Sequence, residues 1–135
     1  MISHNGYIKI LKNILETYQL KLNFVSSTRL KCGALIFKMN ETYTVLCKND
    51  LPENVKFFSI LHEAGHVALN YFSTDPFKYW SAEVEKEINL WALDQIKPFI
   101  SVEFYHETKC LFTRDEDLGY KNIEINLDKN FKGEI

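Results

Sequence analysis

Two histidines four residues apart, with a glutamate directly after the first, form the pattern in this chain that most clearly suggests chemistry. The segment His62-Glu63-Ala64-Gly65-His66 fits the motif H-E-x-x-H. On a helix, residues four apart share a face with β-carbons about 6 Å apart, so both imidazoles project in one direction. Two neutral imidazole nitrogens can then occupy two corners of a tetrahedral zinc site. The spacing therefore predicts a metal site that includes His62 and His66.

Glu63 is expected to act on water rather than on the metal. It follows His62 directly, so it is rotated from His62 by about 100° around the helix axis. That angle keeps its carboxylate from joining the same ion easily, but leaves it within reach of a water at an open coordination position. Zinc lowers the pKa of such a water towards ~7, and a nearby carboxylate can take its proton. We therefore expect Glu63 to be the catalytic general base.

The polar side chains around the motif lie in one stripe of an otherwise apolar helix, expected over residues 52–71. After Lys56 its polar residues have the spacing i, i+3, i+4, i+7 and i+11: Ser59, His62, Glu63, His66 and Asn70. A helix that is apolar nearly all round is a buried one, and a buried polar group without a partner costs roughly 1–3 kcal/mol. The stripe must therefore face a metal, a cleft or water. The alternative without metal is a pair of hydrogen-bonded core histidines beside an ion-paired glutamate.

A catalytic zinc site needs a third protein ligand and an open fourth position. The candidates are Glu83, Glu85 and Glu87, at the start of the next expected helix. Glu85 and Asn89 are four residues apart, so Glu85 could bind the metal while the Asn89 amide oxygen accepts a hydrogen bond from a ligating imidazole. Glu87 lies about 200° from Glu85 around the helix, so the two cannot both face the metal. We favour Glu85, with Glu87 and then Glu83 as alternatives.

The expected cofactor is one Zn²⁺ ion per chain. Two imidazoles and a carboxylate favour zinc, although manganese or iron can occupy such a site. A second electrophile beside the metal is common in hydrolytic sites of this kind, and His106 or Tyr105 are the candidates for it. Nothing in the sequence fixes their location, and a plain surface residue is the simpler interpretation of His106.

The elements that must position these residues follow from hydrophobic periodicity. Helices are expected at 7–22, 52–71, 81–96 and 99–112. Strands are expected at 29–38 and 43–48, joined by a turn at 39–42, with an edge strand or extended tail over 123–127. Residues 113–122 are polar and predict a loop. This order predicts an α+β fold in a single domain over residues 1–135, with three to four helices packed on a short β-hairpin or three-stranded sheet.

The composition argues against several other classes of protein. Hydrophobic residues make up 46% of the chain, which excludes disorder, and 16 basic against 18 acidic residues give a net charge of −2, which argues against direct contact with nucleic acid. No apolar stretch approaches the ~20 residues of a membrane span, and the N-terminus does not resemble a signal peptide. The three cysteines form no disulfide framework, and together with the lack of an export signal and a membrane span this predicts a cytoplasmic protein. Cys32 and Cys47 are expected to be small buried residues.

The segments FSILHEAGHVALNY and EKEINLWALDQIKP, within residues 55–98, resemble the ImmA/IrrE family of metallo-endopeptidases. The family pattern is an H-E-x-x-H helix followed by a helix of roughly E-x-E-A-N-x-F-A-x-x-L-x-x-P. The positions that fall on this second pattern are Glu85, Glu87, Asn89, Ala92 and Pro98. Ile88 stands in place of the usual alanine and Trp91 in place of the usual phenylalanine.

This resemblance implies a small thermolysin-like zincin core in which Glu85, the first glutamate of E-x-E, is the third zinc ligand. It also implies a role, because such proteases, often encoded by prophages and mobile elements, cleave a helix-turn-helix transcriptional repressor. The expected partner is therefore a protein substrate, held as an added strand on the edge of 29–38 or 43–48. The alternative is an anti-repressor that binds its partner on the same metal-binding fold without cutting it. A small stress or toxin-associated hydrolase would share the site and differ in substrate.

Overall fold

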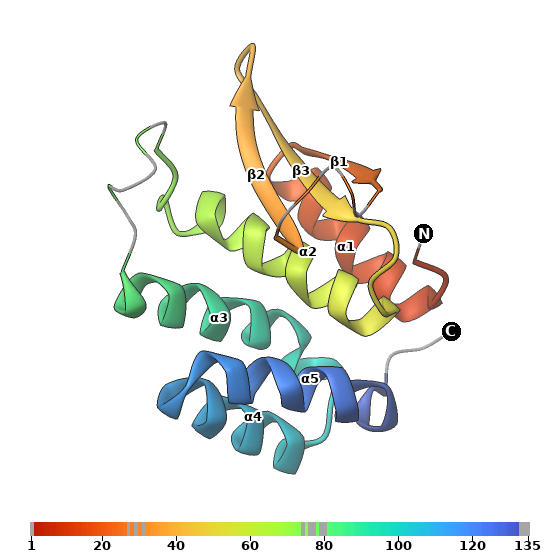
Figure 1. Ribbon diagram of the computed structural model, residues 1–135. Coiled ribbons are helices and arrows are strands. Elements are labelled where there is room, and N and C mark those ends of the chain that lie inside the picture. The colour runs from red at the N-terminus through yellow and green to blue at the C-terminus, as the bar shows by residue number, and fades with distance from the viewer. Residues whose placement is uncertain are drawn as a thin grey trace.

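The computed structural model describes residues 2–26, 28, 30, 32–73, 75, 78 and 81–132 (Figure 1). The elements, in chain order, are α1 (Asn5–Thr17), β1 (Leu20–Val25), β2 (Ala34–Met39), β3 (Thr42–Lys48), α2 (Glu53–Ala68), α3 (Ala82–Ile96), the short 3₁₀ helix η2 (Lys97–Phe99), α4 (Val102–Arg114) and α5 (Glu116–Asn130). The described part of the chain thus contains five α-helices and a three-stranded mixed sheet. This confirms the predicted α+β class, with one α-helix more than expected.

The three strands have the order β1-β3-β2, with β3 in the centre. β2 and β3 are antiparallel, with Ile36 opposite Val45, and form the expected hairpin. Its turn places Asn40 and Glu41 at φ values of 52° and 67°, the left-handed conformations of a type I′ turn. β1 runs parallel to β3, with Leu22 opposite Val45. In the described part of the chain, β3 is therefore paired on both sides, whereas β2 has an unpaired outer edge.

The helix α2 lies at the centre of the fold. It contacts β2 and β3 as well as α1, α3 and α5, and Figure 1 shows the sheet on one side of it and α3, α4 and α5 on the other. Its side chains without any exposed surface are Phe57, Phe58, Ile60, Leu61 and Ala64. Burying a large apolar side chain is worth about 1.5–3 kcal/mol. The polar residues that α2 carries are thus held on a helix fixed by packing on several sides.

The prediction of a helix over 7–22 is wrong beyond Thr17. α1 ends there, and Gln19 adopts a left-handed φ of 53°, which leads the chain into β1. Leu20 and Leu22 continue the helical spacing of the apolar residues, but they belong to the strand. Glycine and asparagine are the residues that usually adopt a left-handed conformation, so a glutamine gives no sign of the turn.

The predictions of a loop over 113–122 and a strand or tail over 123–127 are also wrong. The helix expected over 99–112 is present as α4, and α5 follows it after a single residue, Asp115. The Asp115 side chain caps α5 by accepting a hydrogen bond from the Asp117 amide at 2.8 Å. The chain therefore turns back directly into another helix, which packs against α4.

The apolar residues of α5 show why the alternating pattern misled. Ile123 and Leu127 are 1% and 0% exposed, whereas Ile125 between them is 63% exposed. Residues four apart share one face of a helix and the residue between them points away. The apparent alternation is therefore an inner helical face with one residue directed to solvent.

The packing of α5 on α4 leaves no room for a side chain at Gly119. A β-carbon there would lie 2.2–2.5 Å from ring atoms of Phe112, which is itself buried. Overpacking a core costs typically about 1–3 kcal/mol, and a confined aromatic ring cannot move aside easily. We expect Gly119→Ala to lower the free energy of unfolding by about 3 kcal/mol in chemical denaturation.

The control for this substitution is Gly33→Ala. A β-carbon at Gly33 would meet its nearest neighbour, Leu51 Cδ1, at 3.5 Å, which is ordinary contact. Its free energy of unfolding should change by no more than about 0.5 kcal/mol. Equal losses in the two variants would contradict the steric explanation.

The remaining predictions agree with the structure in part. The helix predicted over 81–96 is confirmed as α3, whose cap Ser81 accepts a hydrogen bond from the Val84 amide at 3.1 Å. The strand predicted over 43–48 corresponds to β3, and that over 29–38 to β2 from residue 34 onward, with residues 29 and 31 outside the described residues. Cys47 is buried as predicted, whereas Cys32 is exposed, so the prediction for Cys32 is wrong.

Among the described residues, no helix combines the length and the apolar character that crossing a bilayer requires.

Candidate metal centre

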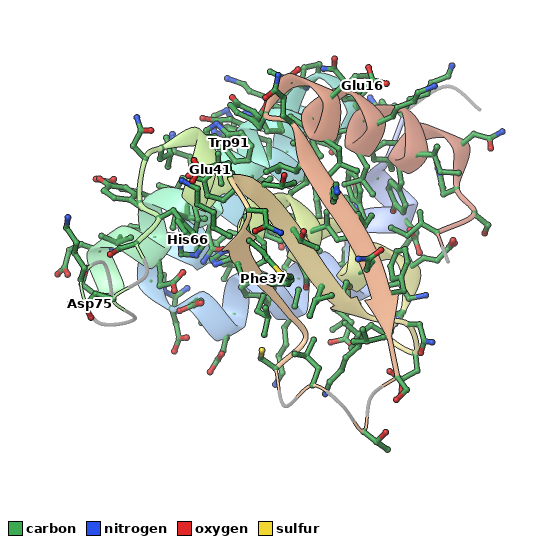
Figure 2. The ribbon with its side chains drawn as sticks, turned by 90° about the horizontal axis from the view of Figure 1, so that it is seen from above. Glu16, Phe37, Glu41, His66, Asp75 and Trp91 are labelled. Atoms are coloured by element: carbon green, nitrogen blue, oxygen red, sulfur yellow. The ribbon has the colours of Figure 1, made fainter. Side chains whose placement is uncertain are left out.

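The structure brings His62, Glu63 and His66 together on α2. One potential ligand atom of each residue lies within 4.8 Å of those of the other two. The imidazole rings meet edge to face, with centroids 5.4 Å apart. His62 is buried, while Glu63 and His66 are half-buried. Figure 2 shows His66 near the edge strand β2, which carries Phe37 and packs on α2.

A second carboxylate, that of Glu85, reaches His62 from α3. Glu85 Oε2 lies 2.9 Å from His62 Nε2, whereas Glu63 Oε2 lies 3.9 Å from the same nitrogen. Two ligand atoms of one tetrahedral zinc ion are about 3.3 Å apart, and the distance of Glu85 Oε2 from His62 Nε2, 2.9 Å, is the nearer of the two to that spacing. Of the three glutamates considered on α3, Glu85 is the one placed beside the histidines, and Glu83 is exposed.

Asn89 determines which nitrogen of His62 is available. The His62 Nδ1 donates a hydrogen bond to Asn89 Oδ1 at 2.7 Å, because an amide oxygen can only accept. In the neutral ring, Nε2 then presents a lone pair toward Glu85. The Glu85 Oε2 atom is screened from solvent and has no hydrogen bond of acceptable geometry, although it lies 2.9 Å from Nε2. Two buried acceptors that face each other need a cation between them, either a proton on Nε2 or a metal ion, and the donor atoms present fit a metal ion.

The charges of these four residues, called here the cluster (His62, Glu63, His66 and Glu85), depend on one another. Burial alone would lower the pKa of His62, but its contacts with Glu85 and Glu63 raise it above the ordinary value. The contact with His62 in turn lowers the pKa of Glu85. Without metal, the two carboxylates favour the protonated form of His62, so a proton is the cation that competes with a metal ion for this place. A divalent cation would displace that proton on binding.

The other two members of the cluster are also shifted. Burial raises the pKa of Glu63 to about 7, with the His62 charge opposing this and the Glu85 charge adding to it. Burial lowers the pKa of His66 below its ordinary value, so this ring is neutral at pH 7. A neutral imidazole is the form that binds a metal.

The end of α2 holds the second histidine. Asn70 adopts a φ of 61°, and the Tyr71 amide donates to the His66 carbonyl at 2.7 Å, so the helix ends at Ala68 in a Schellman motif. The helix predicted over 52–71 therefore ends three residues early. The turn brings the Tyr71 carbonyl to His66 Nδ1, which donates to it at 3.1 Å. Both imidazoles are fixed through Nδ1, which leaves both Nε2 atoms for a ligand.

The crossing of α3 over α2 depends on Gly65. A β-carbon at Gly65 would lie 2.8 Å from Ile88 Cγ2 and 3.1 Å from Trp91 Cε3. Ile88 is fully buried and branched next to its backbone, so it cannot move aside readily. The glycine therefore allows the close approach that brings Glu85 and Asn89 to the histidines.

The other candidates from the sequence have different surroundings. Glu87 is exposed and accepts a hydrogen bond from the Tyr71 hydroxyl at 2.5 Å. The Tyr105 hydroxyl donates to Asp94 at 2.5 Å, and this contact, together with burial, raises the pKa of Tyr105 to about 12. His106 is exposed on α4. Among the described residues, no hydrogen bond, ion pair or ring contact joins these three candidates to the cluster.

Tyr120 belongs to this site and could not be found by the sequence analysis. Its hydroxyl donates a hydrogen bond to Asn89 Oδ1 at 3.0 Å. It lies on α5, in the segment predicted to be a loop, so no face could be assigned to it. The helical spacing of Tyr120, Ile123 and Leu127 is the signal that could have placed it on an inner face.

A cavity adjoins Glu85, one member of the cluster. This cavity of about 280 Å³ is lined by Ser81, Ala82, Glu85 and Glu116. Glu85 and Glu116 line the same cavity, and partial burial together with the Glu85 charge raises the pKa of Glu116. Part of the Glu85 side chain thus borders this cavity, although its Oε2 atom is screened from solvent.

The arrangement combines two imidazoles that share a direction and two carboxylates, one of which borders a cavity. This set of donors suits a zinc ion and hydrolysis assisted by it. Comparisons of the chain with models of protein families, with curated proteins and with solved structures found no match.

Proposed function

We propose that the protein is a zinc-dependent endopeptidase in which His62, His66 and Glu85 hold the metal and Glu63 is the general base. The observation that carries this proposal is the position of Glu85 Oε2, buried without a hydrogen bond at 2.9 Å from His62 Nε2. Three protein ligands leave the open fourth position that characterises catalytic rather than structural zinc.

The chain's own residues manage the protons of the reaction. When bound, zinc supplies the Lewis acidity that polarises a substrate carbonyl and acidifies a water molecule. Glu63, a carboxylate beside the proposed ligands, takes the proton of the attacking water and passes it to the nitrogen of the leaving amine. Its pKa is raised to about 7 by burial in the metal-free chain, and the charge of a bound metal ion would favour the ionised form that accepts a proton. Asn89 and the Tyr71 carbonyl meanwhile hold the two imidazoles in orientation.

The outer edge of β2 is the proposed binding place for an extended substrate. Of the two strands considered, β3 is paired on both sides, which leaves β2. β2 packs on α2, and Figure 2 shows its residue Phe37 on the same side of the molecule as His66. A peptide can join such an edge through main-chain hydrogen bonds. The substrate would therefore be cut in a segment that is extended or locally unfolded.

The resemblance of residues 55–98 to the ImmA/IrrE family supports a particular substrate. We propose a helix-turn-helix transcriptional repressor of a phage or mobile element, cut at a specific site in the cytoplasm. An anti-repressor that captures this partner without cutting it remains the alternative. The position of Glu63 favours cleavage, because capture alone has no need of a buried base beside a metal site.

The proposal is tested with purified protein and the repressor encoded beside its gene. Elemental analysis is expected to find one zinc ion per chain, and mass spectrometry a single cut in the repressor. A chelator should stop cleavage, and added zinc should restore it. A chain that takes up no zinc after loading, or a loaded chain that leaves both the repressor and denatured casein intact, would refute the proposal.

A further inference from the structure

We propose that Tyr120 is a positioning residue of the metal site, whose hydroxyl fixes the Asn89 amide and, through it, the His62 imidazole. The inference rests on the proposed function, because it concerns the same site. It adds a third helix, α5, to the two that carry the ligands.

The Asn89 amide accepts hydrogen bonds from two donors at its oxygen, whereas its nitrogen makes no hydrogen bond of full geometry within the described part of the chain. Its side chain lies in the interior, with 1% of its surface exposed. Oδ1 accepts hydrogen bonds from His62 Nδ1 at 2.7 Å and from the Tyr120 hydroxyl at 3.0 Å, which occupies both of its lone pairs. Nδ2 makes no hydrogen bond of full geometry among the described residues, although the Glu116 carboxylate is near enough for the Asn89 amide to oppose the rise that burial causes in its pKa. The oxygen end of the amide is therefore held by the two donors that meet there.

The opposite orientation of Asn89 is incompatible with a metal on His62. It would place the amide nitrogen, which only donates, against His62 Nδ1. His62 Nδ1 would then have to accept a hydrogen bond from the Asn89 amide. The ring proton would move to Nε2, the atom that faces Glu85. Tyr120 opposes this flip, because the flip would also deprive its buried hydroxyl of the acceptor that it has in the described structure.

The hydroxyl of Tyr120 can perform this role because its ring is held on two sides. The ring packs edge-on against Phe58 of α2 and Phe112 of α4, with centroids 5.5 Å and 5.4 Å away. Burial raises the pKa of Tyr120 well above its ordinary value, so the hydroxyl keeps its proton. Because that proton is donated to Asn89, the group acts on the position of His62 and not on a substrate.

The test is Tyr120→Phe, which removes the hydroxyl and keeps the ring with its aromatic contacts. We expect the zinc affinity, measured by competition with a chelating dye, to fall about 10-fold, as for other outer partners of a metal ligand. In NMR spectra of ¹⁵N-labelled protein, the His62 Nδ1–H signal should broaden or exchange faster with water, because its acceptor is no longer fixed. This signal is recorded in both metal-free and zinc-loaded protein.

The matched control is Tyr7→Phe. Tyr7 is also buried, and its hydroxyl donates to Asp128 of α5, so it joins α5 to α1 instead of α3. This variant should lose stability without losing zinc affinity or the His62 signal. Unchanged affinity and an unchanged signal in Tyr120→Phe, or equal losses in both variants, would overturn the proposal. If the wild-type chain binds no zinc, the proposed function fails, and the signal in metal-free protein alone decides the role of Tyr120.

Discussion

Glu63→Gln should reduce peptide-bond cleavage by about 10²–10⁴-fold, the contribution typical of a general base. Glutamine keeps the shape of the side chain but cannot take a proton from water. The zinc content should remain one ion per chain, because the three proposed ligands are unchanged. Initial cleavage rates are to be compared at equal zinc occupancy, which elemental analysis establishes for each sample.

The same substitution separates cleavage from capture. An endopeptidase loses its effect on the repressor's target genes in Glu63→Gln, whereas a capturing anti-repressor keeps it. Glu16→Gln is the control, because Glu16 is exposed on α1 and its change should alter neither rate nor zinc content (Figure 2). A Glu63→Gln protein that cleaves at the wild-type rate would show that another group takes the proton.

Glu85→Ala should remove the metal. Losing a partner outside the ligand set costs roughly 10–100-fold in metal affinity, so losing a ligand should cost more than about 100-fold. After dialysis, elemental analysis should find little zinc in this variant. Glu87→Ala is the matched control, because Glu87 lies on the same helix but is exposed and bonded to Tyr71. Its zinc content should equal that of the wild type.

Comparing the zinc content of Glu63→Gln with that of Glu85→Ala decides which carboxylate is the metal ligand. Glu63 also has an oxygen within 4.8 Å of ligand atoms of both histidines, so it is a possible ligand by distance alone. We assign that role to Glu85 because its oxygen is 1.0 Å nearer to His62 Nε2, at 2.9 Å against 3.9 Å. Zinc lost in Glu63→Gln and retained in Glu85→Ala would reverse the assignment and the mechanism with it.

The residues around the proposed metal could be identified from sequence because their geometry is local. A spacing of four puts His62 and His66 on one helical face whatever the rest of the fold does. The same rule places Glu85 and Asn89 on one face of the next helix and Glu87 on another face. The structure places Glu85 and Asn89 against His62.

The parts of the fold that sequence could not predict depend on tertiary contacts. Gln19 has a left-handed conformation that its type does not indicate, so β1 was merged with the helix before it. In α5, the polar residues around Gly119 predict a loop, although that glycine lies directly against Phe112 of α4. Because α5 was not expected, neither was Tyr120, which reaches the site from a distant part of the chain.

The two proposed imidazole ligands differ in how mutation can disturb them. The acceptor that orients His66 is the main-chain carbonyl of Tyr71, which every residue at that position would supply as long as the turn at Asn70 forms. The acceptor that orients His62 is the side chain of Asn89, which a single codon change can remove. A transplanted copy of α2 with its terminal turn would therefore preserve one imidazole's alignment and lose the other's. Designers who borrow this motif need the neighbouring helices as well.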